Sequence, residues 1–80
     1  MDTHVKTIHI FVEIDKSNTV KVEFTSELVT GMEIKQAAGV PADWDLGRRT
    51  GQKLEHITDD RQISIKNGEH FVALPPGTIS

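Results

Sequence analysis

An 80-residue chain is long enough for one small domain, which buries only about 60% of its unfolded-chain surface and leaves little room for an enclosed active-site pocket. Nine Lys and Arg against twelve Asp and Glu give a formal net charge of −3, and the scattered basic residues exclude the electrostatic footprint of a nucleic-acid-binding protein. The absence of cysteine excludes a disulfide framework, a thiolate nucleophile and a zinc–thiolate site. Neither a run of about 18 apolar residues nor a signal-peptide pattern occurs, so we expect a cytoplasmic protein without membrane contact.

Apolar and polar residues alternate over residues 5–14, which is the period of a half-buried strand. Phe11 is the one exception to this alternation. Residues 15–18 are turn formers, and the alternation resumes over residues 20–24. The pattern predicts an antiparallel hairpin.

The next segment carries the signals of a short helix. Thr30 precedes Glu33 by three residues, as a capping box requires, while Val29 and Ile34 stand where a hydrophobic staple is found. Gly39 offers a left-handed cap at the other end. We therefore predict a helix of roughly two to three turns between the two caps.

After the helix the pattern predicts several short strands. Leu54 and Ile57 supply apolar anchors in this region, and Asn67-Gly68 is a turn signal. Residues 69–74 form a last predicted strand, which the following prolines must end because proline lacks the amide donor. The order of hairpin, helix, short strands and final strand indicates an α+β domain, with one helix covering one face of a mixed sheet.

Several residues invite a chemical interpretation that their context does not support. His4 and His9 lie five apart on an apparent strand and form no tight ligand pair, so we expect rim histidines and no metal. Asp59-Asp60 is expected to be a polar turn, and Trp44 a core or core-edge residue. No nucleophile–base pair can be assembled, so we predict neither an enzyme nor a cofactor.

The run from Thr30 to Leu74 resembles ubiquitin in the order and spacing of its elements, which is that of the β-grasp fold. The chain is more similar still to prokaryotic ubiquitin-like modifiers of the multiubiquitin type. Their domains carry a "TG-x-E-I…AG" helix and a "G-x-x-F" strand, which read here Thr30-Gly31-Met32-Glu33-Ile34, Ala38-Gly39 and Gly68-Glu69-His70-Phe71. The resemblance covers nearly the whole chain and implies a domain over residues 1–74 with an extended tail over residues 75–80.

The resemblance implies a protein modifier that catalyses nothing itself. Its partners would be an adenylating (activating) enzyme, a conjugating enzyme and a processing or deconjugating peptidase. This chemistry needs an unhindered glycine at the end of an extended tail, and Gly77 is the candidate. The expected processing and conjugation segment comprises Pro75, Pro76, Gly77 and Thr78.

The sequence departs from ubiquitin at its terminus and at its binding face. In place of a final Gly-Gly it has residues 75–80, so a peptidase would have to remove residues 78–80 before conjugation through Gly77. Near the position of ubiquitin's apolar patch, the residues expected to face a partner are Arg48, Arg49, His70 and Val72. For the two arginines, partner contact and simple solvation both remain open, because adjacent strand residues point to opposite faces.

Two further functions remain open. One is a noncovalent interaction module that binds a partner through its sheet face or final strand edge, with the tail as a passive end. The other is a sulfur carrier with a C-terminal thiocarboxylate, which shares the fold but requires a free Gly-Gly-type end. The bond formed, the target proteins and the oligomeric state are open at this stage.

Overall fold

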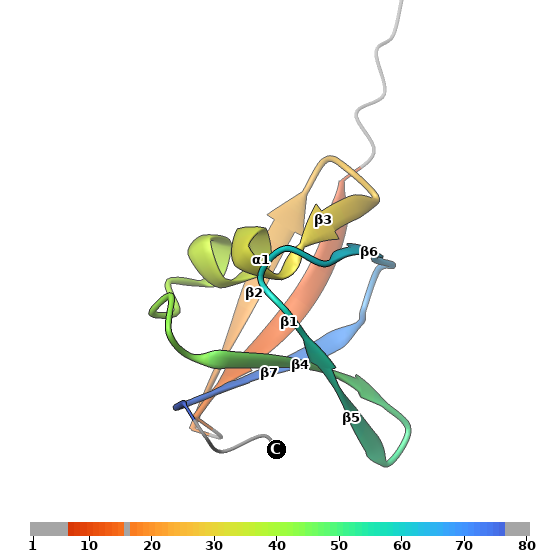
Figure 1. Ribbon diagram of the computed structural model, residues 1–80. Coiled ribbons are helices and arrows are strands. Elements are labelled where there is room, and N and C mark those ends of the chain that lie inside the picture. The colour runs from red at the N-terminus through yellow and green to blue at the C-terminus, as the bar shows by residue number, and fades with distance from the viewer. Residues whose placement is uncertain (1–6, 16, 77–80) are drawn as a thin grey trace, which may run out of the picture.

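The computed structural model describes residues 7–15 and 17–76, and Figure 1 shows the arrangement of their elements. Within these residues the chain forms strands and one helix, in the order β1 (Ile8–Ile14), β2 (Asn18–Phe24), β3 (Leu28–Thr30), α1 (Gly31–Ala38), β4 (Asp45–Thr50), β5 (Lys53–Ile57), β6 (Gln62–Ser64) and β7 (His70–Leu74). The α+β organisation predicted from the sequence is confirmed. None of the helices in the described part of the chain is both long enough and apolar enough to cross a membrane.

The strands form one large mixed sheet and one small sheet. The large sheet has the order β2-β1-β7-β4-β5, and the small one pairs β3 with β6. β1 and β2 make the predicted antiparallel hairpin, whereas β7 runs parallel to β1 and antiparallel to β4. The last strand of the chain therefore lies in the middle of the large sheet.

Helix α1 begins and ends where the sequence predicts. Thr30 Oγ1 accepts a hydrogen bond from Glu33 N over 3.2 Å, and Glu33 Oε1 accepts one from Thr30 N over 2.8 Å, which completes the capping box. Gly39 closes the helix in the left-handed region, with φ of 77°. The eight residues between the caps make a little over two turns.

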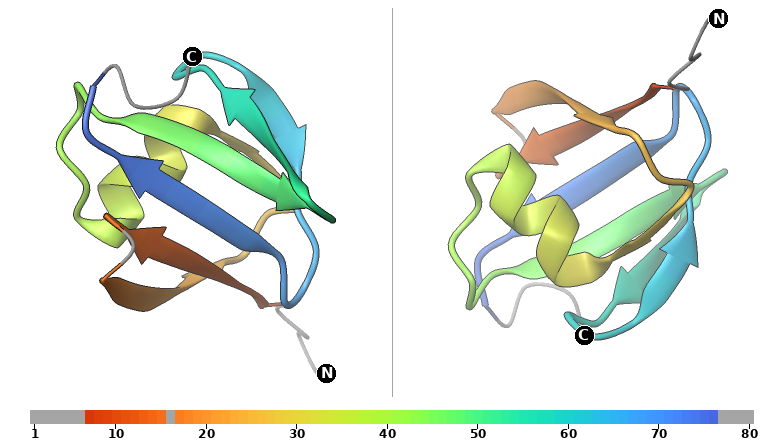
Figure 2. Two further views of the ribbon diagram at one scale, coloured as in Figure 1. Left: turned by 90° about the horizontal axis from the view of Figure 1, so that it is seen from below. Right: turned by 90° about the horizontal axis from the view of Figure 1, so that it is seen from above.

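The helix packs across one face of the large sheet, as the two views in Figure 2 show. We call this the helix-side face and the opposite one the outer face. The core between sheet and helix contains fully buried residues from several strands and from the helix, including Ile10, Val12, Ile34, Leu46 and Phe71. Trp44 is half-buried and packs against this core, as expected.

Two strand predictions need correction. Strand β1 begins at Ile8, and Thr7, which was predicted to belong to it, lies outside its ladder; predicted positions 5 and 6 lie outside the described residues. The short strand β3 was not predicted, since the alternation over its three residues is too brief to recognise. Its partner β6 lies 32 to 36 residues further along the chain, and this pairing supplies its backbone hydrogen bonds.

Candidate partner-binding face

The outer face of the sheet carries a row of side chains, one from each strand. The strand register places Lys21 beside Phe11, Phe11 beside His70, and Leu54 beside Arg49. The Phe11 and His70 rings stack, with centroids 5.3 Å apart and an interplanar angle of 22°. These five residues, which we call the cross-strand row, combine an aromatic centre with basic and apolar ends.

Phe11 was the exception to the predicted alternation, and the structure gives the reason. Ile10 and Val12 point into the core, so Phe11 lies on the outer face, half-buried against the His70 ring. A half-exposed aromatic residue on the solvent side of a strand is typical of protein contact surfaces. The break in the pattern was thus the available signal for this residue.

Arg49 is an exposed basic residue of the row that makes one long ion pair within the chain. Its side chain is 53% exposed, and Nη2 lies 3.7 Å from Glu13 Oε1. An exposed ion pair at this distance is weak because water screens it. The Arg49 guanidinium is therefore exposed and only weakly held by Glu13.

Val72 was expected at the surface, and this expectation is wrong. It belongs to the outer face, opposite Gly47 in the register, but it is only 2% exposed. A Cβ at Gly47 would lie 2.7 Å from Leu54 Cγ, so the Leu54 side chain occupies the space above this glycine, beside Val72. Leu54 was predicted as an apolar anchor, but it is 37% exposed and forms part of the surface that Val72 was expected to supply.

Arg48 points to the helix-side face and is engaged within the chain. Its side chain is 18% exposed, donates from Nη1 to Ser64 O over 3.0 Å, and pairs through Nη2 with Glu55 Oε1 over 3.2 Å. Arg61 Nη2 donates to the other carboxylate oxygen of Glu55 over 2.8 Å. The hydrogen bond from Arg61, and then that from Arg48, lower the pKa of Glu55. Arg48 therefore serves the fold, and of the two arginines Arg49 is the one available to a partner.

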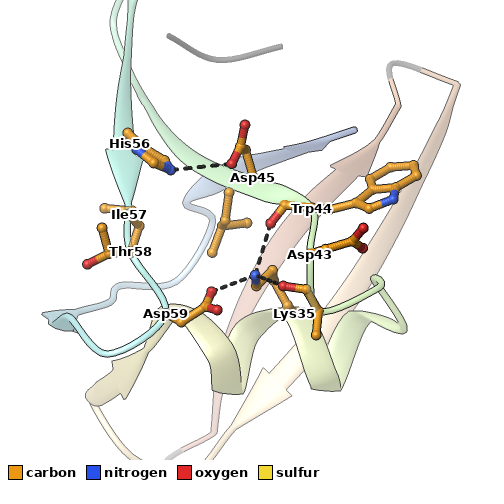
Figure 3. A pocket seen from close by; sticks show the side chains of 10 residues that line it. Lys35, Asp43, Trp44, Asp45, His56, Ile57, Thr58 and Asp59 are labelled. Carbon is orange, nitrogen blue, oxygen red and sulfur yellow. Dashed lines mark hydrogen bonds and ion pairs between the residues drawn. The ribbon is translucent and has the colours of Figure 1, made fainter. Parts of the chain in front are cut away.

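Lys35 is a buried cation that sequence reasoning did not single out. Its side chain is 3% exposed, and Nζ donates to Ala42 O over 2.7 Å and to Trp44 O over 2.9 Å. Asp59 Oδ1 lies 2.5 Å from the same nitrogen, as Figure 3 shows. These acceptors satisfy the three donors of the ammonium, so the group joins α1 to two loops. It is not available as a base or nucleophile.

An open pocket of about 300 Å³ lies beside Lys35. On its far wall, His56 Nε2 lies 3.7 Å from Asp45 Oδ1. Within residues 7–15 and 17–76, no three His, Asp or Glu side chains gather closely enough to hold a metal ion. Lys35 thus lines this pocket with all three of its donors engaged.

The predicted tail segment lies only partly within the described residues. β7 ends at Leu74, which pairs with Asp45; Pro75 is half-buried and Pro76 exposed. Gly77 and Thr78 lie outside the described residues. Comparison with known proteins adds no assignment, because no family model matches the chain and no curated protein matches it significantly.

Proposed function

We propose that this chain is a ubiquitin-like domain of the β-grasp fold that acts as a protein modifier, joined to its targets through Gly77. The observation that carries the proposal is the course of β7. This central strand holds His70 of the cross-strand row at its start and runs directly into Pro75 and Pro76. The centre of the cross-strand row and the proposed conjugation segment thus belong to one continuous stretch of chain.

The distance along β7 fits simultaneous recognition by one enzyme. At about 3.3 Å per residue, Gly77 lies at most about 23 Å along the chain from His70. An adenylating or conjugating enzyme that holds the outer face can therefore hold the tail in a channel at the same time. Two adjacent prolines favour an extended backbone directly after β7.

The chemistry of the proposal belongs to the partner enzymes. A processing peptidase would remove residues 78–80, and the adenylating enzyme would then activate the Gly77 carboxylate with ATP for transfer to an amine. Glycine suits this terminus because it has no Cβ to obstruct a narrow channel. The role of this chain is to bind and to present the carboxylate.

The test is to identify the remnant that the modifier leaves on its targets. An N-terminally tagged chain would be produced in its native cells, purified under denaturing conditions, and digested with trypsin. The chain has no Lys or Arg after Lys66, so trypsin leaves residues 67–77 attached to each modified lysine. We expect target peptides that carry this remnant, and a ladder of higher-mass species on a denaturing gel.

The matched control is Gly77→Arg, which blocks the terminus and changes a residue that follows the end of β7 at Leu74 in the sequence. It should abolish both the ladder and the remnant while the far-UV circular dichroism spectrum stays unchanged. A remnant that extends to Ser80 would refute processing after Gly77. Absence of any remnant from the unsubstituted chain would refute the modifier function itself.

A noncovalent interaction module is the second candidate, supported by the stacked Phe11–His70 pair and the exposed Leu54 at the end of the same row. Such a surface binds without any chemistry at the tail. This alternative predicts that Gly77→Arg leaves partner binding intact, whereas Phe11→Ala weakens it. The same pair of variants therefore separates the two functions.

A further inference from the structure

Strand β2 forms one border of the large sheet. It pairs with β1 along its whole length, and none of the described strands pairs with its other side. An unpaired strand edge is a template for the addition of another strand, and folded proteins usually protect it. The sequence of this edge therefore decides what it can accept.

The register shows which backbone groups of β2 are unpaired. Phe11 N donates to Glu69 O over 2.9 Å, and Asp15 N donates to Ala73 O over 2.8 Å. The odd-numbered residues of β1 therefore direct their backbone N–H and C=O groups toward β7. The even-numbered residues of β1 direct their backbone groups the other way and form the hydrogen-bonded pairs with the even-numbered residues of β2. It follows that Thr19, Lys21 and Glu23 direct their N–H and C=O groups out of the sheet.

The charges along this edge select one register for pairing with an identical strand. Two antiparallel copies are related by a twofold axis. An axis at Lys21 or at Glu23 sets like charges opposite each other, and an axis at Val20 makes no charge pair. An axis at Val22 sets each Lys21 opposite Glu23 of the second copy, with their outward backbone groups in reach of one another.

We infer that this chain associates with a second copy of itself through β2, with Val22 on the twofold axis, so that the two large sheets become one continuous sheet. A lone lysine on an edge strand opposes pairing, but a lysine with a glutamate two residues away permits this one register. The inference does not depend on the modifier function proposed above.

The helix-side face of the edge supports the same register. Val20 and Phe24 are only partly buried, although both pack against the core. With Val22 on the axis, each Val20 lies opposite Phe24 of the second copy, and an aromatic residue beside a β-branched one is a favourable cross-strand pair. Association would remove apolar surface from water that the single chain leaves exposed.

Glu23 already has a neighbour in the single chain, and the pairing accommodates it. His9 Nδ1 lies 3.4 Å from Glu23 Oε2, and the Glu23 side chain is 56% exposed. The carboxylate has a second oxygen, so it can lie between His9 on one side and Lys21 of the second copy on the other. The Lys21 side chain lies on the outer face, where it can reach that carboxylate.

The test uses charge reversal in the intact chain, with mass measured by sedimentation velocity. A strand-edge contact buries less surface than the ~1,200 Å² of a stable interface, so the dimer should be weak. The protein concentration in the experiment therefore has to reach about 1 mM. The unsubstituted chain should move from its 8.9 kDa monomer toward twice that mass. Lys21→Glu and Glu23→Lys should each weaken the association about tenfold or more, because both set like charges opposite each other twice.

The decisive experiment measures the association of an equimolar mixture of the two variants. In the mixed dimer every reversed charge meets an opposite one, so an equimolar mixture should regain the association that each variant alone has lost. Their net charges of −5 and −1, two units to either side of −3, are both negative, so overall charge supplies no attraction between the two variants. The double variant K21E/E23K should also associate like the unsubstituted chain.

Two outcomes would overturn the inference. One is an unsubstituted chain that stays at the monomer mass up to about 1 mM. The other is association that persists in both single variants, or that the mixture does not restore while circular dichroism shows each variant folded. The first excludes self-association, and the second excludes this edge and register. Neither result bears on the tail of residues 75–80.

Discussion

Replacement of Lys35 by methionine should destabilise the domain more than any exposed charge substitution. Methionine keeps most of the apolar stem and removes only the ammonium, which donates to Ala42 O and Trp44 O and pairs with Asp59. Each carbonyl left without a partner in a buried place costs about 1–3 kcal/mol. Because the adjacent pocket is open and Asp59 is 47% exposed, water relieves part of this cost, and we expect a total of about 2–4 kcal/mol.

This loss is large for a domain of this size. At 0.05–0.15 kcal/mol per residue, 80 residues give a free energy of unfolding of about 4–12 kcal/mol. Urea unfolding followed by far-UV circular dichroism, and by the fluorescence of the single tryptophan, would measure the change. With a slope of about 1 kcal/mol per molar urea, the midpoint should fall by about 2 M or more.

The matched control is Asp59→Asn, which removes the exposed partner and leaves both carbonyl contacts in place. We expect it to reduce the free energy of unfolding by less than about 1 kcal/mol, because solvent already screens this carboxylate. The reasoning would be refuted if Lys35→Met were no more destabilising than Asp59→Asn. In that case the packing of the Lys35 aliphatic chain, and not the contacts of its ammonium, would stabilise the fold.

Two other substitutions test local features of the fold. Glu55→Gln should destabilise the chain at neutral pH, because hydrogen bonds from Arg61 and Arg48 favour the ionised carboxylate and lower the pKa of Glu55. The ionised carboxylate stabilises the fold fully above pH 4.5, and this stabilisation is lost as the pH falls through the lowered pKa. The difference in urea midpoint between the two chains should therefore shrink on acidification below pH 4.5, and a constant difference would contradict the assigned cause. Gly31→Ala places a Cβ in steric overlap with Thr58 O, a backbone atom that cannot move aside alone, so this substitution should cost about 1–3 kcal/mol in the same assay. An unchanged midpoint would show that the loop yields without strain.

The β2 edge shares only Lys21 with the cross-strand row, and the other four residues of the row lie on other strands. The cross-strand row runs over the outer face, the edge lies at one border of the sheet, and β7 leads to the tail from the middle. A second copy joined through β2 would therefore engage Lys21 and leave Phe11, His70 and the residues of the row on β4 and β5 uncovered, together with the end of β7. Self-association and a role as a modifier are compatible in this geometry.

Local sequence determined the elements whose signals are themselves local. Thr30 and Glu33 lie three residues apart, and each satisfies a backbone amide of the other, so the position of the helix start is specified locally, although the amides of Gly31 and Met32 also donate to carbonyl oxygens of the distant loop before β6. Gly39 takes a left-handed conformation that most residues avoid, which ends the helix in the same way. The alternation over residues 8–14 likewise fixed which side chains of the first strand enter the core.

Only the tertiary structure decided which of the expected surface residues are accessible. Val72 is buried on the outer face, where Gly47 lies beside it on β4 and the Leu54 side chain from β5 occupies the space above that glycine. Lys35 is buried because loops distant in sequence from α1 bring their oxygens around its ammonium. Strand periodicity assigns a residue to a face of the sheet, but burial on that face depends on neighbours from other strands and loops, which a single local pattern does not contain.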